Sequence, residues 1–258
     1  MAQWERRRVL VTVKAAPQVG KKHGESVCVG GIDLDRKEWI RLYPCHFREL
    51  PFERRFSKYQ VIEVDVRKAS DARRESYTPN EDTISPFGEP LRAGESTERR
   101  AHLLPLAEAS MCAIKAAQQR DGTSLGLFRQ PEAPDLIVSP NDQEWHTLYA
   151  DQGDMLNPHR VPLERPPYRF SFRYSCTDEG CPGHEQTIAD WEISEAYRGW
   201  RRSHASDKAT IAAIRDKWSE MWAPEREPYI FTGNMVKFPS QFLVLGVFYP
   251  RRLKDVQP

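Results

Sequence analysis

The stretch that most constrains the fold of this chain of 258 residues lies at positions 168–202. Residues 168–174 alternate aromatic with polar side chains, which predicts a strand with one apolar face. Cys176, Cys181 and His184 follow with the spacing C-x4-C-x2-H. Thiolate and imidazole groups this close in sequence are typical zinc ligands, and the glycines and the proline between them allow a sharp turn of the backbone. The sequence therefore predicts a zinc-knuckle-like turn.

Two kinds of zinc site are compatible with this motif, and so is the absence of a metal. A structural site needs a fourth ligand, for which Cys28, Cys45, His46 and His204 qualify by residue type. A catalytic site would use the three motif residues and leave the fourth position to water. Two cysteines five residues apart also occur without a metal. We expect zinc in a structural role, because the motif joins a predicted strand to a predicted helix.

The predicted helix follows from apolar residues at helical spacing, namely Ile188, Trp191, Ile193, Ala196, Tyr197 and Trp200. Its acidic residues offer an alternative in which the metal is catalytic. Asp190, Glu192 and Glu195 could join His184 in a site that hydrolyses phosphodiesters. On a helix Asp190 and Glu192 point in different directions, so only Glu192 and Glu195 share a face. The helix dipole explains Asp190 better, as a structural acid in the first turn.

Short stretches rich in β-branched residues fill the first third of the chain. They lie at 9–15, 26–34, 38–44 and 58–69. Several short strands joined by polar turns predict a small barrel or sandwich. Residues 69–100 are poor in large apolar side chains and rich in turn formers, so they are expected to form an extended surface linker.

The second part of the chain alternates helices and strands, so the predicted fold class is α+β. One amphipathic helix is expected to begin near Pro105 and to end before Asp121, and Cys112 within it is expected to be a small packed residue. Another covers 206–223 with Ser206 as its N-cap. The remaining predictions are short strands at 125–128 and 135–139 and two strands at the C-terminus, the last of them buried.

Charge is distributed unevenly along the chain. Residues 1–74 carry 17 Lys and Arg against 10 Asp and Glu, and the remainder carries 21 against 27. A basic first third suggests a phosphate-bearing partner, although such charge often forms only a solvated face. The expected contact residues combine positive charge with aromatic rings that could stack on bases: Trp39, Arg41, Tyr43, Arg48, Lys58 and Tyr59. The alternative is that the face with Trp39, Arg41 and Tyr43 belongs to the core.

Several protein classes are excluded or disfavoured. The chain has no phosphate-binding loop, no dinucleotide-binding glycine motif, no serine hydrolase elbow and no H-E-x-x-H helix. Its five scattered cysteines argue against a disulfide framework and for a reducing compartment. No apolar stretch approaches the ~18 residues of a membrane span. We therefore expect a cytoplasmic protein that does not contact membranes.

Blocks of this sequence resemble a family of bacterial proteins that contain dual OB-fold domains. The resemblance is carried by residues 26–44, SVCVGGIDLDRKEWIRLYP, by FSKYQVIEVDVRK, by the C-x4-C-x2-H motif with DWE, and by FLVLGVFYP near the C-terminus. It implies small β-barrels of a kind often used on nucleic acid, and it implies no reaction. The linker predicted over residues 69–100 divides the chain into an OB-like basic β-barrel with this linker, residues 1–100, and a β domain with helical insertions and the knuckle, residues 101–258.

The function expected from the sequence is that of a nucleic-acid-binding accessory protein with structural zinc, in a bacterial defence or mobile-element system. Its partner is expected to be DNA or RNA in single-stranded form, with further protein partners. A metal-dependent nuclease or related hydrolase centred on residues 176–195 is the first alternative. A protein-interaction subunit of a larger assembly is the second.

Overall fold

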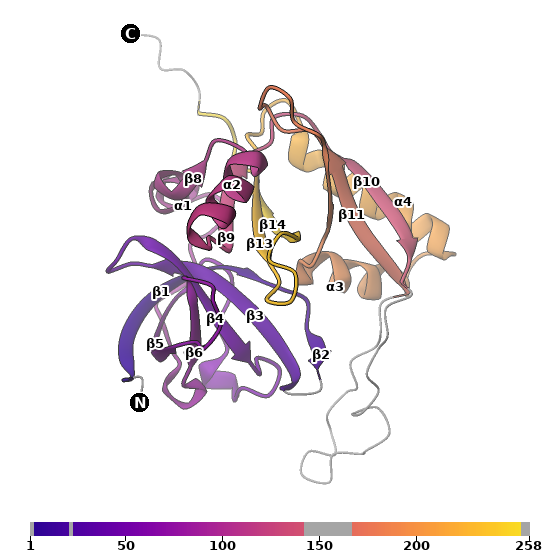
Figure 1. Cartoon of the computed structure of the whole chain (residues 1–258). Coiled ribbons are helices and arrows are strands. Elements are labelled where there is room, and N and C mark those ends of the chain that lie inside the picture. The colour runs from indigo at the N-terminus through magenta and orange to yellow at the C-terminus, as the bar shows by residue number, and fades with distance from the viewer. Residues whose placement is uncertain (1–2, 21–22, 142–166, 254–258) are drawn as a thin grey trace.

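The computed structural model describes residues 3–20, 23–141 and 167–253 (Figure 1). An N-terminal β-barrel is followed by two further sheets with helices packed on them. The predicted α+β class, with an OB-like barrel in the N-terminal part, is therefore confirmed. No helix in the described ranges combines the length and the apolar composition needed to cross a membrane.

Five strands close the barrel, in the order β1 (Glu5–Lys14), β3 (Gly24–Asp33), β4 (Glu38–Cys45), β6 (Ser76–Pro79) and β5 (Val61–Lys68). The ring is complete because β5 also pairs with β1. β4 and β6 are parallel, whereas the other neighbours in the ring are antiparallel. Two short strands extend this sheet, β2 (Gln18–Gly20) on β3 and β7 (Ser85–Phe87) on β5. A small closed barrel of five strands is the OB-like architecture.

Alternate residues of the strands fill the barrel. Val9 and Val11 of β1 point into it, where they meet Ile40 and Leu42 of β4. Leu10 lies between the two valines and faces the outside of the barrel, yet it is also completely buried. It belongs to a second core that contains residues of both parts of the chain. β1 is therefore covered on both faces, and the barrel is not a separate body.

The shared core joins the barrel to the C-terminal part. It contains Leu10, Val13, Ile32, Tyr59 and Leu103 from the barrel side, and Leu125, Leu127, Tyr229, Phe231, Leu245 and Phe248 from the other side. Two aromatic pairs cross the junction: the ring centroids of Trp39 and Phe231 are 6.1 Å apart, and those of Tyr59 and Phe248 are 6.3 Å apart. Because each large apolar side chain contributes ~1.5–3 kcal/mol on burial, this core holds the two parts together.

The C-terminal part has two open sheets. One contains β10 (Asp135–Pro140), β11 (Tyr168–Tyr174) and β12 (His184–Thr187), and the other contains β14 (Phe242–Phe248), β13 (Tyr229–Asn234), β9 (Leu125–Arg129) and β8 (Ala107–Glu108). The helices are α1 (Ser96–Leu103), α2 (Met111–Asp121), α3 (Trp191–Trp200) and α4 (Asp207–Ser219), with short 3-10 turns η1 (Phe52–Arg54), η2 (Glu81–Thr83), η3 (Leu104–Leu106) and η4 (Glu220–Trp222). Neither sheet closes by itself into the second barrel that the resemblance implies, and a parallel bridge between Ile188 and Val244 joins the two sheets.

The prediction of an extended linker over residues 69–100 was wrong. β6 lies in this segment and pairs with both β4 and β5, which makes it an interior strand of the barrel. β7 and the start of α1 lie there as well. Composition was misleading because β6 is held by main-chain pairing on both sides, and a strand of four residues needs few large apolar side chains.

The first predicted helix begins later than expected. Residues 104–106 form the 3-10 turn η3, and α2 begins after Ser110, whose Oγ accepts a hydrogen bond of 3.0 Å from the Ala113 amide. This N-cap satisfies a free amide of the first turn, which explains the start at Met111. The N-cap predicted at Ser206 is confirmed, since its Oγ accepts a bond of 3.2 Å from the Ala209 amide.

Candidate metal centre and cationic cavity

Three cysteines and one histidine converge beside the N-terminal end of α2. Cys112 comes from the first turn of α2, Cys176 and Cys181 from the turn between β11 and β12, and His184 from the first position of β12. Their four ligand atoms all lie within 4.8 Å of one another. The cluster could bind a metal ion such as zinc.

The distances within the cluster are close to those of a tetrahedral zinc site, and the shortest of them are slightly below those values. The Sγ atom of Cys176 is 3.4 Å from that of Cys112 and 3.3 Å from that of Cys181. His184 Nε2 is 3.3–3.6 Å from the three sulfur atoms. A zinc ion ~2.3 Å from sulfur and ~2.0 Å from nitrogen holds its ligand atoms roughly 3.4–3.8 Å apart. The donor set and its spacing therefore fit zinc with four protein ligands.

The prediction for Cys112 was wrong, since it is the fourth member of this cluster. Ser110, the N-cap of α2, also donates a hydrogen bond from Oγ to Asp178, and this bond ties the start of the helix to the knuckle. Cys112 lies outside the apolar series of its helix, which includes Met111 and Ile114. This position outside the apolar series was the one sign in the sequence that Cys112 is more than a small packed residue.

The four residues considered for the fourth position lie elsewhere. Cys45 is buried in the barrel core. Cys28 accepts a bond of 3.2 Å from Arg41, and His46 pairs with Glu81. Nδ1 of His204 is 2.8 Å from the carbonyl oxygen of Trp200. The cluster assembled by the fold contains none of them.

Two glycines shape the knuckle. Gly180 and Gly183 have φ angles of 74° and 81°, a left-handed conformation that other residues rarely adopt. The turn brings the Cys181 amide to 3.2 Å from the Asp178 carbonyl oxygen, and the Gly183 amide donates to Cys181 Sγ at 3.4 Å. Main-chain hydrogen bonds therefore hold the turn and the Cys181 sulfur in place.

Burial shifts the protonation of two members of the metal-free cluster, His184 and Cys112, in opposite senses. Burial, together with the nearby Lys115 ammonium, lowers the pKa of His184, so its imidazole is neutral and can bind a metal. Burial raises the pKa of the Cys112 thiol to about 12, with hydrogen bonds to the other two thiols adding to the effect. Since metal ligands bind in the deprotonated form, metal uptake would release thiol protons.

A cavity of about 590 Å³ lies between the barrel and the C-terminal part. Its cationic lining residues are Arg41, Arg73, Arg169, Arg198 and Lys237, and its aromatic ones are Tyr43, Tyr168, Phe170 and Phe238. No Asp or Glu occurs among the described residues that line it. Carboxylates outside the lining already pair with two of these cations, Arg73 with Asp71 and Arg198 with Glu195. The charge of the lining that remains favours an anionic ligand.

Comparison with protein families gives two adjoining matches. Residues 107–258 match a domain of unknown function, DUF8757, which covers more than half of the chain. The chain belongs to this family. Residues 5–105 match a second domain of unknown function, DUF8758. No curated protein matches the chain significantly.

The two matched regions meet at residue 106, in the turn η3. All four members of the metal cluster lie in the DUF8757 region. The cavity, in contrast, is built from both regions.

The acidic residues of α3 are not part of the metal cluster. Asp190 is the N-cap of α3, where its Oδ1 accepts a bond of 3.0 Å from the Glu192 amide, as its predicted structural role requires. Glu192 lies 3.0 Å from Lys58 Nζ. Glu195 pairs with Arg198 at 3.0 Å. Each carboxylate therefore has a local partner from the protein.

Several residues expected to contact nucleic acid are interior. Arg41 is buried and donates from Nη2 to the Ser124 carbonyl oxygen at 2.7 Å. Tyr59 is buried, with the Arg99 guanidinium 3.7 Å from its ring centroid. Trp39 packs on Phe231. The expectation of an open surface is therefore wrong for Arg41 and Tyr59, because the C-terminal part covers this face of the barrel.

The other three expected contact residues differ among themselves. Tyr43 lines the cavity, and its ring meets that of His23 with centroids 5.8 Å apart. Arg48 forms bonds of 2.9 Å with both carboxylate oxygens of Glu25. Lys58 is paired with acidic residues of α3. Of the six residues, Tyr43 and Arg41 line the cavity, and a binding role for the set stays a prediction.

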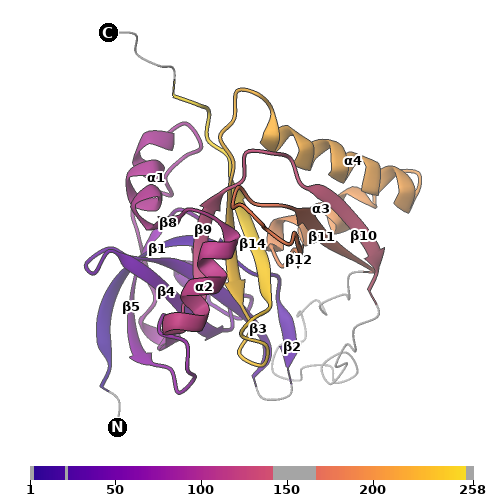
Figure 2. The same ribbon diagram turned by 45° about the horizontal axis from the view of Figure 1, so that its top comes forward.

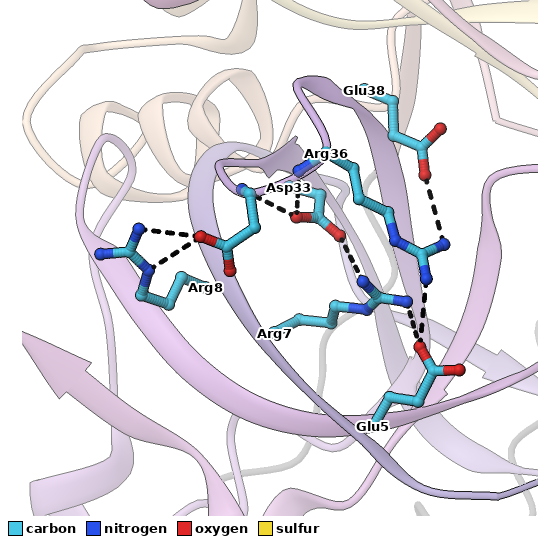
Figure 3. A network of polar contacts seen from close by, with 7 residues as sticks. Glu5, Arg7, Arg8, Asp33, Arg36 and Glu38 are labelled. Carbon is cyan, nitrogen blue, oxygen red and sulfur yellow. Dashed lines mark hydrogen bonds and ion pairs between the residues drawn. The ribbon is translucent and has the colours of Figure 1, made fainter.

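The arginine run at the start of β1 is balanced by acidic neighbours (Figure 3). Arg8 pairs with Asp35 at 2.8 Å, and buried Arg7 contacts Glu5 and, at 3.5 Å, Asp33. The Glu5 carboxylate also pairs with Arg36. The guanidinium of Arg36 in turn lies 3.7 Å from Glu38. The positive charge of this run is therefore neutralised within the barrel, as expected for a solvated face rather than a phosphate-binding patch.

Proposed function

We propose that this chain is a nucleic-acid-binding protein in which the Cys112, Cys176, Cys181 and His184 centre holds a structural zinc ion. The observation that carries the proposal is the cavity between its two parts, whose described lining contains five cationic side chains and no carboxylate. Single-strand-binding sites combine positive charge for the phosphates with aromatic rings for the bases. The lining of this cavity has both.

The cavity lies on the part of the barrel with which other OB barrels bind nucleic acid. This analogy of fold supports nucleic acid as the partner. OB barrels bind oligonucleotides with the face of their second and third strands and with the adjoining loops. In this barrel those strands are β3 and β4, whose residues Ser26, Cys28, Arg41 and Tyr43 line the cavity. The segment after β1 contributes Ala15 to Gln18, and the loop between β5 and β6 contributes Arg73.

The metal centre favours a binding protein over the nuclease alternative. Four protein ligands complete a tetrahedron, whereas a catalytic zinc keeps one position open for water or substrate. The centre fastens α2 to the turn between β11 and β12, so it has a mechanical use. Asp190, Glu192 and Glu195, which the nuclease alternative requires, are engaged with Lys58 and Arg198.

The expected ligand is single-stranded DNA or RNA, because a cavity of about 590 Å³ admits bases and a backbone more readily than a duplex. An accessory role in a bacterial defence or mobile-element system, which fits the resemblance, belongs to the same proposal. Further protein partners would be recruited through other surfaces.

Fluorescence anisotropy with labelled single-stranded and duplex oligonucleotides, at ~50 mM and ~200 mM salt, tests this proposal. We expect single strands to bind with an affinity that falls as salt rises. Arg169→Ala should weaken binding and reduce the salt slope by about 0.7, the effect of one lost contact to a single-strand phosphate. Arg173→Ala is the matched control, because it is also an exposed arginine of β11 but pairs with Glu185 and does not line the cavity. Equal behaviour of both variants, or no binding by the parent, would contradict the proposal.

A further inference from the structure

His46 directly follows β4, the strand that carries the cavity-lining Tyr43. Both nitrogens of the His46 ring face oxygen acceptors. Nδ1 lies 3.1 Å from each carboxylate oxygen of Glu81 in η2, and Nε2 lies 3.0 Å from the main-chain oxygen of His23. A ring turned by 180° would direct C–H groups at these oxygen atoms, so hydrogen bonding selects the observed orientation.

The two acceptors favour the protonated form of the ring. A neutral imidazole has one N–H donor, whereas an imidazolium has two. Neither the main-chain oxygen of His23 nor the ionised carboxylate of Glu81 can donate, so only the imidazolium satisfies both contacts. When the proton is lost, the carboxylate keeps the remaining N–H, because a charged acceptor forms the stronger hydrogen bond. The lone pair of Nε2 then faces the His23 oxygen, and this contact becomes repulsive.

The groups that face His46 stabilise its charge. Burial tends to lower the pKa of His46, but the hydrogen bond and the charge of Glu81 outweigh it. The His23 oxygen and the Glu49 carboxylate add to the effect of Glu81, and the pKa is raised. The folded protein therefore holds this proton more tightly than the unfolded chain does.

Other ionisable groups of the neighbouring elements have partners of their own or are neutral. Glu25 of β3 is bound by Arg48 at 2.9 Å, and Asp82 of η2 pairs with Arg54 at 2.6 Å. Burial raises the pKa of the Cys45 thiol, which is therefore neutral at neutral pH. The Glu81 carboxylate is thus the main group that controls the protonation of the ring.

The His46 ring connects η2 to the β2–β3 hairpin. His23 immediately precedes β3, and its ring meets that of Tyr43 with centroids 5.8 Å apart. β2 has three residues, and Gln18 of β2 pairs with Ser26 of β3, both of which line the cavity. Figures 1 and 2 show β2 at the edge of the barrel, beside β3. Because so short an edge strand has few contacts of its own, its position depends on how this end of the hairpin is fastened.

We propose that His46 regulates the cavity as a proton-dependent clamp, which as an imidazolium holds the β2–β3 hairpin in the position that binds single-stranded nucleic acid. Loss of the proton releases the His23 oxygen, and with it the hairpin. Because the folded pKa of His46 lies above the ordinary value, the clamp is complete below about pH 6.5 and is lost as pH rises through the folded pKa. The inference rests on the proposed function and adds a regulation of the same site.

Two measurements on the full chain test the clamp. NMR titration gives the pKa of His46, whose signals are identified among the seven histidines by their absence from the spectrum of His46→Gln. We expect a pKa above the ~6.5 of an unperturbed histidine. Fluorescence anisotropy with the labelled single strand, at constant salt between about pH 6 and about pH 9, should show an affinity that falls roughly tenfold through this pKa, the effect of one lost charged hydrogen bond.

Three variants identify the group that titrates. Glu81→Gln should lower the pKa of His46 and move the loss of affinity to lower pH, which separates His46 from Lys14, whose pKa burial lowers to about 8. His46→Gln should abolish the pH dependence, because an amide does not titrate in this range. His204→Gln is the matched control, since Nδ1 of His204 also lies 2.8 Å from a carbonyl oxygen, but that oxygen belongs to Trp200 and not to the hairpin. Its pH dependence should equal that of the parent.

Amide hydrogen exchange of residues 18–20 and 24–26 reports on the hairpin without any ligand. Protection relative to the intrinsic exchange rate should decrease above the pKa of His46 in the parent, and His46→Gln should show no such step. Circular dichroism confirms that the variants are folded, and the parent titration and exchange decide the question if one is not.

The outcomes separate this inference from the proposed function. A pKa of His46 at or below ~6.5, or an affinity and a protection that do not follow its titration, overturns the clamp while single-strand binding stands. If no strand binds at any pH, the proposed function is wrong, and hydrogen exchange alone then decides whether His46 fastens the hairpin.

Discussion

Lys58 of the barrel and Asp190 at the start of α3 face each other across the junction of the two parts, with Nζ and Oδ2 3.9 Å apart. The same ammonium lies closer to Glu192, at 3.0 Å. Asp190 is almost completely buried, so desolvation raises its pKa to about 6, although Lys58 acts in the opposite direction. The buried carboxylate is therefore less stable in its charged form than it is in water.

This relationship predicts a pH dependence of stability. Between about pH 4 and pH 6 the folded protein holds a proton on Asp190 that the unfolded chain has released, so this group lowers stability as pH rises. Asp190→Asn keeps an N-cap residue and a neutral side chain. We expect its melting temperature, relative to the parent, to increase from about pH 4 to about pH 7. The measurement is thermal unfolding by circular dichroism at several pH values, and a constant or decreasing difference would show that Lys58 outweighs desolvation.

A second prediction concerns the metal. The purified protein should contain about one equivalent of zinc, and Cys112→Ser should lower both the zinc content and the melting temperature, as Cys181→Ser should. Cys28→Ser is the matched control, since Cys28 is also partly buried but lies outside the cluster. Elemental analysis and thermal unfolding check both quantities. If Cys112→Ser kept its full zinc content, Cys112 would not be the fourth ligand.

The role of Cys112 marks the limit of what the sequence could predict at this site. Cys176, Cys181 and His184 were found because their spacing is local, and the turn between them depends on glycines that can be identified in sequence. Cys112 is 64 residues from Cys176. Their contact depends on how α2 packs against the β11–β12 turn, and no local pattern encodes that packing.

The same distinction applies to the fold. β5 and the N-cap of α4 were predicted because hydrophobic alternation and capping are properties of neighbouring residues. β6 was missed because it is specified by strands on both of its sides. The sequence predicted a common face for Trp39, Arg41 and Tyr43 of β4. Its cover comes from Ser124, 83 residues after Arg41 and next to β9, and from Phe231 of β13.

A third prediction tests the ion pair between α1 and the C-terminal part. Arg100 is buried, lies 2.6 Å from Glu227 and donates to the Arg251 carbonyl oxygen at 2.8 Å. Burial tends to raise the pKa of Glu227, but the hydrogen bond from Arg100 outweighs it and the pKa is lowered. Glu227→Gln should destabilise the protein by about 1–3 kcal/mol at neutral pH, because Arg100 keeps its charge without a carboxylate.

The lowered pKa of Glu227 determines how the stability difference between the parent and Glu227→Gln changes with pH. The stability contributed by the Glu227 carboxylate is present above its unfolded pKa and is lost as pH falls through the lower folded value, so parent and variant should converge in acid. The exposed neighbour Glu225 provides the control, and Glu225→Gln should change stability little. Urea unfolding at neutral and acidic pH measures both effects. If the difference in unfolding free energy between the parent and Glu227→Gln grew in acid, this explanation would be wrong.

The last prediction separates a stacking aromatic residue from one that is merely exposed. Phe238 is 51% exposed at the turn of the β13–β14 hairpin and lines the cavity, next to Lys237. If a base stacks on its ring, Phe238→Ala should weaken single-strand binding by ~1–3 kcal/mol, the usual contribution of one stacked base, and leave the melting temperature nearly unchanged. Phe52, which is 86% exposed in η1 of the barrel and does not line the cavity, is the matched control. Both substitutions remove an exposed aromatic ring, so a nonspecific loss of apolar surface would affect them equally. A selective loss in Phe238→Ala connects the hairpin to the ligand, whereas equal affinities for the two variants would mean that the hairpin only covers the barrel.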